Sequence, residues 1–223
     1  MVNSDKLSPA IIQSLGLSAK EIYDVCTKIV KIYDLKSNIL DFGSGQGKLL
    51  KYLTLLDKTN LTGADLMPRP TDLDSKIEWI QADLNNELPV PDESFNSILA
   101  IEVIEHLENP RSTAREWKRI LKKKGVIVLS TPNNNSIRAI IALILKGHFV
   151  SFLNKDYPAH ITALTRLDIN RVLTETGFKN IKFYYSNKGL IPGLRGLTWQ
   201  NISFGLLKGE KFSDNVFAVA INE

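Results

Sequence analysis

Apolar positions along the chain follow two patterns, short continuous runs and longer stretches with a period near 3.6 residues. The short runs predict buried strands, and the helical spacing predicts helices that cover them. We expect strands at 38–42, 61–65, 77–81, 95–101, 126–130, 181–186 and 216–221, and helices at 17–33, 48–56, 109–122, 136–145 and 165–176. This alternation predicts an α/β protein with a mostly parallel sheet that helices cover on both faces.

Two regions depart from this pattern. Residues 1–17 have no clear period, and we expect a loosely held arm there, with Ser18 as the N-cap of the first helix. Residues 133–163 interrupt the alternation and are interpreted as an insertion or lid within one domain spanning 1–223. The stretch 136–145 is too apolar for a solvated helix. It is interpreted as a helix buried against the core or a dimer partner, as a substrate lid, or, with residues up to 153, as a peripheral membrane contact.

Composition and charge describe an ordinary globular chain. Of 223 residues, 43% are hydrophobic and 23% charged, which suits one sizeable core. The single cysteine, Cys26, cannot form an internal disulfide, and the first residues lack the apolar core of a signal peptide, so we expect a cytoplasmic location. The net charge of +4 comes from dispersed basic residues, which makes a nucleic-acid partner unlikely. The oligomeric state is undetermined.

A glycine-rich turn between the first strand and the next helix is the strongest chemical signal. It reads Asp41-x-Gly43-x-Gly45-x-Gly47. Glycine allows a sharp reversal and lets a ligand approach the backbone closely. A dinucleotide fingerprint would place its third glycine where Lys48 stands, and a P-loop would require Ser or Thr where Leu49 stands.

Acidic residues follow each of the first four strands. They are Asp41, Asp65, Asp83 and Glu102. Because ligands of open parallel sheets lie beyond the carboxyl ends of the strands, we expect these carboxylates to converge on one site. Asp65 follows the glycines at the spacing at which an acid accepts hydrogen bonds from both ribose hydroxyls of a nucleoside, and Asp83 can accept from an adenine amino group.

Residues 35–131, together with 165–186, resemble class I S-adenosylmethionine (SAM) dependent methyltransferases. The resemblance rests on the acid–glycine motif and on Asp83-Leu84 followed by a Pro-rich loop, Asp92-x-x-Phe95 and an apolar strand. It implies a Rossmann-like, doubly wound, mostly parallel seven-stranded sheet with one antiparallel strand, helices on both faces, and SAM as cofactor. The implied cofactor-binding residues are Asp41, which balances the cationic amino-acid portion, Gly43, Gly45, Gly47, Asp65, Leu66, Asp83, Leu84 and Glu102.

The stretch after the fourth strand suggests catalysis. If the chain turns helical there, Glu102, Glu105 and His106 lie on one helical face. Glu-x-x-Glu-His with His160 further on resembles two metal-using subsets of the family, the ubiquinone-pathway O-methyltransferases and the enzymes that methylate the 3′-terminal ribose of small RNAs. The resemblance implies a divalent metal ion held by Glu102, Glu105, His106 and His160. The alternative is that this sequence is common in the fold, with His106 a helix cap or a general base.

We therefore expect a SAM-dependent methyltransferase that methylates a hydroxyl oxygen, with His106 and Glu105 as catalytic residues. The region from His160 to Phe178 resembles methyltransferases of bacterial cell-surface saccharides or lipid-linked substrates. The acceptor is accordingly expected to be a small molecule or a lipid-linked or saccharide compound. The alternatives are an NAD-type oxidoreductase and a non-catalytic SAM-binding protein.

Overall fold

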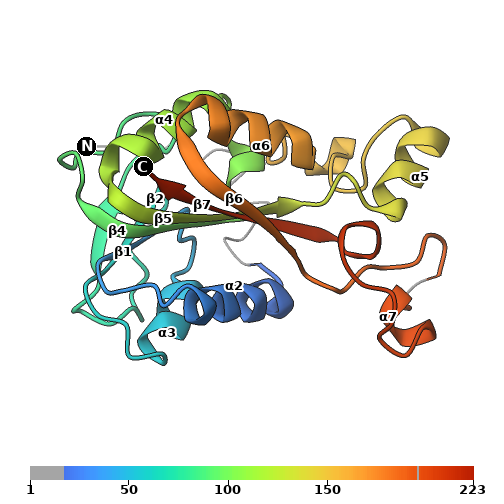
Figure 1. Ribbon diagram of the computed structural model, residues 1–223, viewed down its shortest axis with the longest axis horizontal. Coiled ribbons are helices and arrows are strands. Elements are labelled where there is room, and N and C mark those ends of the chain that lie inside the picture. Colours follow the sequence, from blue (N-terminus) through green and yellow to red (C-terminus); the bar gives the residue numbers. More distant parts are fainter. Residues whose placement is uncertain (1–17, 195) are drawn as a thin grey trace.

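A seven-stranded sheet forms the centre of the protein in a computed structural model, which describes residues 18–194 and 196–223 (Figure 1). The arm expected at 1–17 lies outside the described residues. The strands are β1 (Ile39–Phe42), β2 (Leu61–Asp65), β3 (Glu78–Gln81), β4 (Phe95–Ile101), β5 (Leu121–Pro132), β6 (Phe178–Tyr185) and β7 (Asn215–Asn222), in the order β3-β2-β1-β4-β5-β7-β6. β7 is antiparallel to β5 and β6, and the other pairs are parallel. The predicted sheet with one antiparallel strand is confirmed.

Helices cover both faces of this sheet. In Figure 1, α2 (Lys20–Ile32) and α3 (Lys48–Thr54) lie below it, and α4 (Pro110–Ile120) and α6 (Arg166–Glu175) lie above it. Two further helices, α5 (Ile137–Lys146) and α7 (Trp199–Ile202), lie at one end of the molecule. Three short 3₁₀ helices complete the described chain: η2 (Ile104–His106), η3 (Asn154–Asp156) and η4 (Glu210–Phe212).

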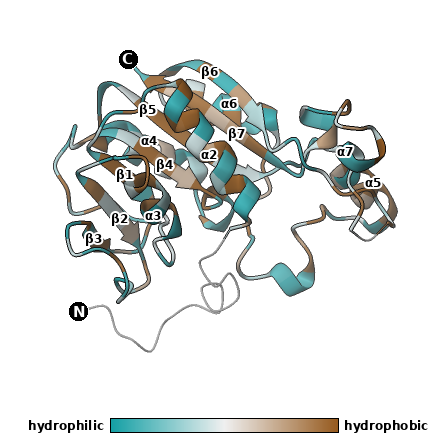
Figure 2. Ribbon diagram, turned by 90° about the horizontal axis from the view of Figure 1, so that it is seen from below, coloured by the Kyte–Doolittle hydropathy of each residue, from teal (hydrophilic) through white to brown (hydrophobic). Residues whose placement is uncertain are grey.

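The sheet separates two hydrophobic cores. Successive side chains of a strand point to opposite faces of the sheet. Ile39 therefore packs against α2 and α3, whereas Leu40 packs against α4 and α6. The upper core is centred on Trp117, whose ring meets Phe42 edge-on with the centroids 5.7 Å apart. Figure 2 shows the consequence, with apolar strands enclosed by helices whose outer faces are polar. The central strands are buried on both sides and mostly apolar, whereas the edge strands β3 and β6 carry exposed polar residues.

Several boundaries differ from the sequence prediction. Ala19, not Ser18, is the N-cap of α2, and the Ser18 amide instead donates to the Tyr23 hydroxyl at 3.0 Å. The helix expected to run to 122 ends at Ile120, because Leu121 is fully buried and pairs with Phe95 as the start of β5. The predicted strand 181–186 begins earlier, at Phe178, which is buried and pairs with β7.

The apolar helix predicted at 136–145 forms but does not enter the core. Ala139 is the only buried residue of α5, and Ile144 and Leu145 are each 75% exposed. The interpretation of this helix as part of the core of this chain is therefore wrong, because packing against the sheet would bury more of its length. Among the described residues, no helix has the length and apolar character needed to cross a membrane.

Candidate active site

The turn between β1 and α3 has a backbone that only glycine tolerates at two of its positions. Gly43 has φ +85°, and a Cβ atom on it would lie 2.5 Å from Cγ2 of Val103. Gly47, the left-handed N-cap of α3, has φ +69°, and its Cβ would lie 2.9 Å from Cδ1 of Leu73. The turn is also tied to β2, since the amides of Gly43 and Ser44 both donate to the carbonyl of Ala64. The result is a bare, closely held backbone beside a cavity.

Asp65, at the end of β2, holds this turn from the other side. Its Oδ2 accepts from the amide of Gly45 at 2.7 Å, and its Oδ1 accepts from the amide of Met67 at 2.8 Å. Burial raises the pKa of Asp65, and these two donors act in the opposite direction. The amide of Leu66 also interacts with this carboxylate, which has about four lone-pair positions, so acceptor capacity remains for a hydroxyl group of a ligand.

Asp41 is a buried carboxyl group beside the glycine turn that a cationic ligand would stabilise. Its side chain is 2% exposed, and Oδ2 has no hydrogen-bond partner within the described part of the chain. Burial, with a smaller contribution from the charge of Asp65, raises the pKa of Asp41 to about 8. A cationic group in the cavity would offset this cost and favour the ionised carboxylate.

These groups surround a cavity of about 370 Å³, which lies within the range typical of ligand sites. All predicted cofactor-binding residues except Gly47 line it: Asp41, Gly43, Gly45, Asp65, Leu66, Asp83, Leu84 and Glu102. Asp83 reaches it from the loop after β3. α2 and the residues before it also line the cavity, through Ser18, Ala19, Ile22 and Tyr23, and this was not predicted from the sequence. The amphipathic pattern of α2 was visible in the sequence, but its position over the glycine turn was not.

Glu102 does not belong to a helix, contrary to the prediction. It has φ +54°, and the helix that follows is the 3₁₀ turn η2, which begins at Ile104. Its carboxylate accepts from Oγ of Ser130 at 2.7 Å and from Nδ2 of Asn215 at 2.9 Å. Burial raises the pKa of Glu102 to about 7. Glu102 is thus held toward β5 and β7. Its predicted position on one helical face with Glu105 and His106 is wrong.

The structure brings Glu105, His106 and His160 together on the wall of the same cavity. One ligand atom from each lies within 4.8 Å of the other two, and Glu102 is not part of this group. Nδ1 of His106 lies 2.7 Å from the carbonyl of Ala159, and Nδ1 of His160 lies 2.5 Å from that of Ser151. Because a carbonyl can only accept, these two contacts favour the tautomer in which each Nδ1 carries the proton, which would leave the Nε2 of His160 a lone pair for a ligand. His106 also has a backbone contact with Glu102.

Burial shifts the pKa values of His106 and Glu105 in opposite directions. Burial, and then the neighbouring His160, lowers the pKa of His106 to about 4, so this imidazole is neutral at pH 7 but a weak base. Oε2 of Glu105 is buried without a hydrogen-bond partner among the described residues, and burial together with the charge of Glu102 raises the pKa of Glu105. A divalent cation would satisfy this orphan oxygen. The third histidine, His148, lies outside the group and contacts the carbonyl of Phe149.

A methyltransferase domain family model matches residues 18–182, which is more than half of the chain. The chain belongs to this methyltransferase family. It is similar to the ubiquinone biosynthesis O-methyltransferase of Rickettsia typhi, with 25% identity over 201 residues that cover 84% of this chain and 78% of that protein. The protein of the same name from Pseudomonas syringae is 28% identical over 150 residues, covering 60% of this chain and 63% of that one. The crystal structure of a SAM-dependent methyltransferase from Archaeoglobus fulgidus has the same fold, with a TM-score of 0.60 and 17% identity over 89% of this chain and 94% of that one.

The protein is therefore a SAM-dependent methyltransferase, and its cavity suits that cofactor. When bound, SAM supplies a methyl group on a positively charged sulfonium. The bare backbone at Gly43 and the unpaired carboxylate of Asp41 fit its cationic amino-acid portion, and Asp65 retains acceptor positions for the ribose. Family membership does not support the alternatives of an NAD-type oxidoreductase or a non-catalytic binding protein.

Proposed function

We propose that this enzyme transfers the methyl group to a hydroxyl oxygen of a small apolar or lipid-linked acceptor. The observation that supports this most is the position of Glu105, His106 and His160 on the wall of the cavity that also carries the proposed cofactor-binding residues. Hydroxyl methylation requires a group beside the methyl donor that removes the hydroxyl proton or lowers the pKa of the hydroxyl. The Rickettsia and Pseudomonas relatives are themselves named O-methyltransferases.

Within this proposal, Glu105, His106 and His160 would hold a divalent cation, with Glu102 outside the ligand set. The cation would lower the pKa of a hydroxyl that binds it. The low pKa of His106 suits a ligand, since a metal-bound imidazole must be unprotonated. The same low pKa makes His106 a poor general base for a hydroxyl. Glu105 would supply the negative charge of the site, because a buried carboxylate ionises when a cation is present.

The segment 133–163 would cover the acceptor side of the cavity. The amides of Ile161 and Thr162 both donate to the carbonyl of Glu105, at 2.9 and 3.0 Å, and the Thr162 hydroxyl donates to the carbonyl of Leu107 at 2.6 Å. These bonds position His160 beside His106. The segment would thereby exclude water from the acceptor and provide one of the cation ligands.

A methyl-transfer screen with labelled SAM tests the proposal. The acceptors are hydroxylated aromatic compounds, lipid-linked hydroxyl compounds, glycans and RNA 3′ ends, each assayed with Mg²⁺, Mn²⁺ or Zn²⁺ and with excess chelator. Transfer to a hydroxyl that stops with chelator is the expected result. Transfer only to nitrogen or carbon acceptors would contradict the proposal, and full hydroxyl transfer in chelator would remove the cation from it.

Metal binding can also be measured without turnover. Calorimetry with Mn²⁺ alone should show binding that weakens about tenfold or more in Glu105→Gln and His160→Asn. His148→Asn is the matched control and should bind Mn²⁺ as the wild type does, because His148 lies outside the cluster. SAM affinity should change little in all three variants. Equal Mn²⁺ affinity in all four proteins would refute the ligand assignment.

A further inference from the structure

Two segments far apart in the sequence form an exposed apolar surface at one end of the molecule. Figures 1 and 2, which differ by a 90° turn, both place α5 and α7 at this end. We call this surface the apolar end and define it by these exposed residues: Leu143 (41%), Ile144 (75%), Leu145 (75%), Leu194 (51%), Leu197 (43%), Ile202 (52%), Phe204 (96%) and Leu206 (84%). Single exposed apolar residues are ordinary, but eight of them on two segments at the same end of the molecule indicate a contact surface.

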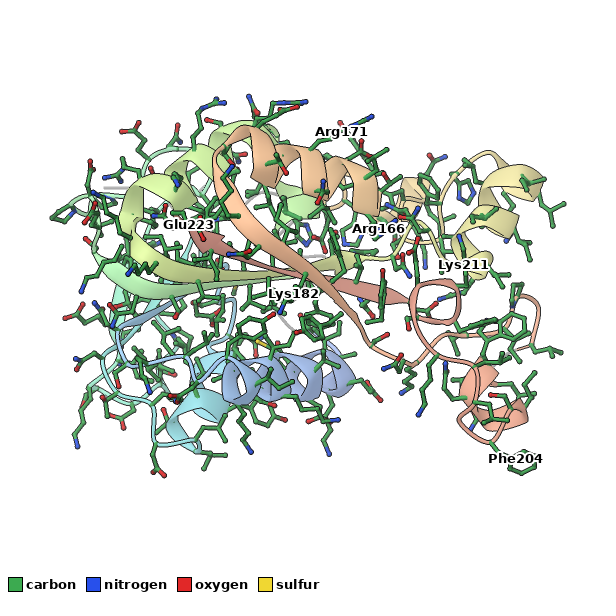
Figure 3. All side chains as sticks on the ribbon, in the orientation of Figure 1. Arg166, Arg171, Lys182, Phe204, Lys211 and Glu223 are labelled. Carbon is green, nitrogen blue, oxygen red and sulfur yellow. The ribbon has the colours of Figure 1, made fainter. Side chains whose placement is uncertain are left out.

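The loop that carries Phe204 has internal hydrogen bonds that hold its side chains outward. The amide of Gly205 donates to the carbonyl of Gln200 at 2.9 Å, and Nε2 of Gln200 donates to the carbonyls of Leu207 at 2.7 Å and Phe212 at 2.9 Å. Figure 3 shows the Phe204 ring at the tip of this loop, pointing away from the rest of the protein. The loop therefore presents its largest apolar side chain to the surroundings through defined backbone bonds.

The charged side chains of these two segments are all basic. Residues 136–153 and 187–209 contain no Asp or Glu, although the chain has 24 acidic residues in all. The same stretches contain Arg138, Lys146, Lys188, Arg195 and Lys208. Among residues 18–194 and 196–223, Lys146 and Lys208 are exposed and form no salt bridge. The apolar end thus combines hydrophobic side chains with unneutralised positive charge.

We propose that the apolar end binds the surface of a membrane that contains anionic lipids. Apolar side chains that enter the interface and lysines that meet anionic headgroups are the two contributions that peripheral binding requires. A second copy of this chain fits less well, because a symmetric contact would bring the same lysines of both copies together. Isolated tips such as Phe204 also match a deformable lipid layer better than a flat protein surface.

A line of aromatic rings connects the apolar end with the cavity. α5 leads into Phe149, whose ring centroid lies 6.5 Å from that of Phe152. The ring of Phe152 lies 5.5 Å from His160, and His160 lies 4.8 Å from His106. The segment that follows α5 thus also carries His160 of the site, which suits an acceptor taken from the lipid. This connection rests on the proposed function, whereas lipid binding itself does not.

Vesicle flotation with the full-length protein tests the inference. Vesicles of phosphatidylcholine with phosphatidylglycerol should carry the protein, and vesicles of phosphatidylcholine alone should carry much less. The double variants Phe204→Ser/Leu206→Ser and Ile144→Ser/Leu145→Ser should each weaken binding roughly tenfold or more. The control Ile32→Ser/Leu55→Ser removes side chains that are 65% and 79% exposed at the ends of α2 and α3, two helices that lie apart from α5 and α7 (Figure 1), and it should bind as the wild type does.

The charge contribution has its own matched pair of variants. Lys146→Gln/Lys208→Gln should weaken binding to the anionic vesicles roughly tenfold and reduce its dependence on salt. Lys123→Gln/Lys124→Gln makes the same change in net charge at an exposed site far from the apolar end and should have little effect.

Two outcomes would overturn the inference. One is the absence of binding to anionic vesicles, or an equal loss of binding in the variants and their controls. The other is a dimer in light scattering that the apolar variants dissociate while vesicles remain unbound, which would assign the surface to a second copy. Calorimetric binding of SAM by every variant establishes that each is folded. Vesicle binding does not depend on turnover, so its failure and a failure of the methyl-transfer screen are distinguishable.

Discussion

Replacing Asp65 by alanine separates two roles that this carboxylate has in the structure. Asp65 accepts two backbone hydrogen bonds, at 2.7 Å from Gly45 and 2.8 Å from Met67, and these hold the glycine turn. Its remaining acceptor positions are those proposed for the ribose of SAM. The substitution therefore affects the free energy of unfolding of the empty protein and, separately, the affinity for the cofactor.

The magnitude follows from the number and kind of bonds. Hydrogen bonds to a charged group contribute about 1.5–3 kcal/mol each, so the two backbone bonds are worth about 3–6 kcal/mol before the cost of burying the carboxylate. That cost is real, because burial raises the pKa of Asp65, and it reduces the net loss to about 2–3 kcal/mol. Loss of the ribose bonds should weaken SAM binding by about 3 kcal/mol, or roughly 100-fold.

Urea denaturation and calorimetry measure these two quantities on the same variants. Asp65→Asn retains one carbonyl acceptor and should lose about half as much stability as Asp65→Ala. Asp83→Ala is the control, since Asp83 is exposed and its side chain accepts only from Asn85 and Asn86. It should lose cofactor affinity but less than about 0.5 kcal/mol of stability.

An Asp65→Ala protein with an unchanged urea midpoint and unchanged SAM affinity would contradict both roles of Asp65. A loss of stability with full affinity would leave Asp65 as a support of the turn and remove its role toward the ribose.

Three further predictions concern the same cavity. Gly43→Ala should lower the free energy of unfolding by about 2–4 kcal/mol and abolish SAM binding. Gly43→Ala/Val103→Ala should recover only the loss caused by the clash with Val103, because a φ of +85° remains strained for alanine. Thermal denaturation with and without SAM measures both effects. With a pKa of about 4, His106 binds fewer protons in the folded state than in the unfolded state, so its contribution should fall by up to about 3 kcal/mol as the pH drops from 6.5 to 4, while the raised pKa values of Asp41 and Glu102 act in the opposite direction. The difference in unfolding free energy between the wild type and His106→Asn isolates this contribution in urea denaturation, and a difference that does not change with pH would contradict the assignment. Asn215→Ala should cost about 1–2 kcal/mol at pH 8 and less at pH 6, since Glu102, with a pKa of about 7, is ionised only at the higher pH; equal melting temperature shifts at the two pH values would argue against this.

The central strands could be predicted because their signals are local. β1, β2 and β4 are short, mostly apolar segments next to turns or polar stretches, and such segments are buried in the centre of a parallel sheet. The early start of β5 at Leu121 was missed because the lysines at 122–124 interrupt the apolar run. The pairing of Leu121 with Phe95 across the sheet decides that boundary, and the local pattern contains no sign of it.

The cofactor side of the cavity was also readable from the chain. Gly43 is required by its positive φ and by the approach of Val103, and Asp65 ends a strand next to the turn that it holds. These are requirements on the backbone, so they leave a fixed spacing in the sequence. Ser18 and Tyr23 line the cavity because α2 packs over the glycine turn, and no sequence pattern predicts that packing.

The fold class, the glycine turn and the kinds of side chain available for chemistry could be predicted from the amino-acid sequence. Which of these side chains meet depends on tertiary packing. Glu102 turns toward Asn215, which lies 113 positions away in the chain, whereas Glu105 and His106 meet His160 through the hydrogen bonds that fasten Ile161 to η2. The apolar end likewise joins α5 to the loop around Phe204. The physical reason is that strand runs and turn conformations depend on neighbouring residues, while side-chain partners and solvent exposure depend on which distant segments pack together.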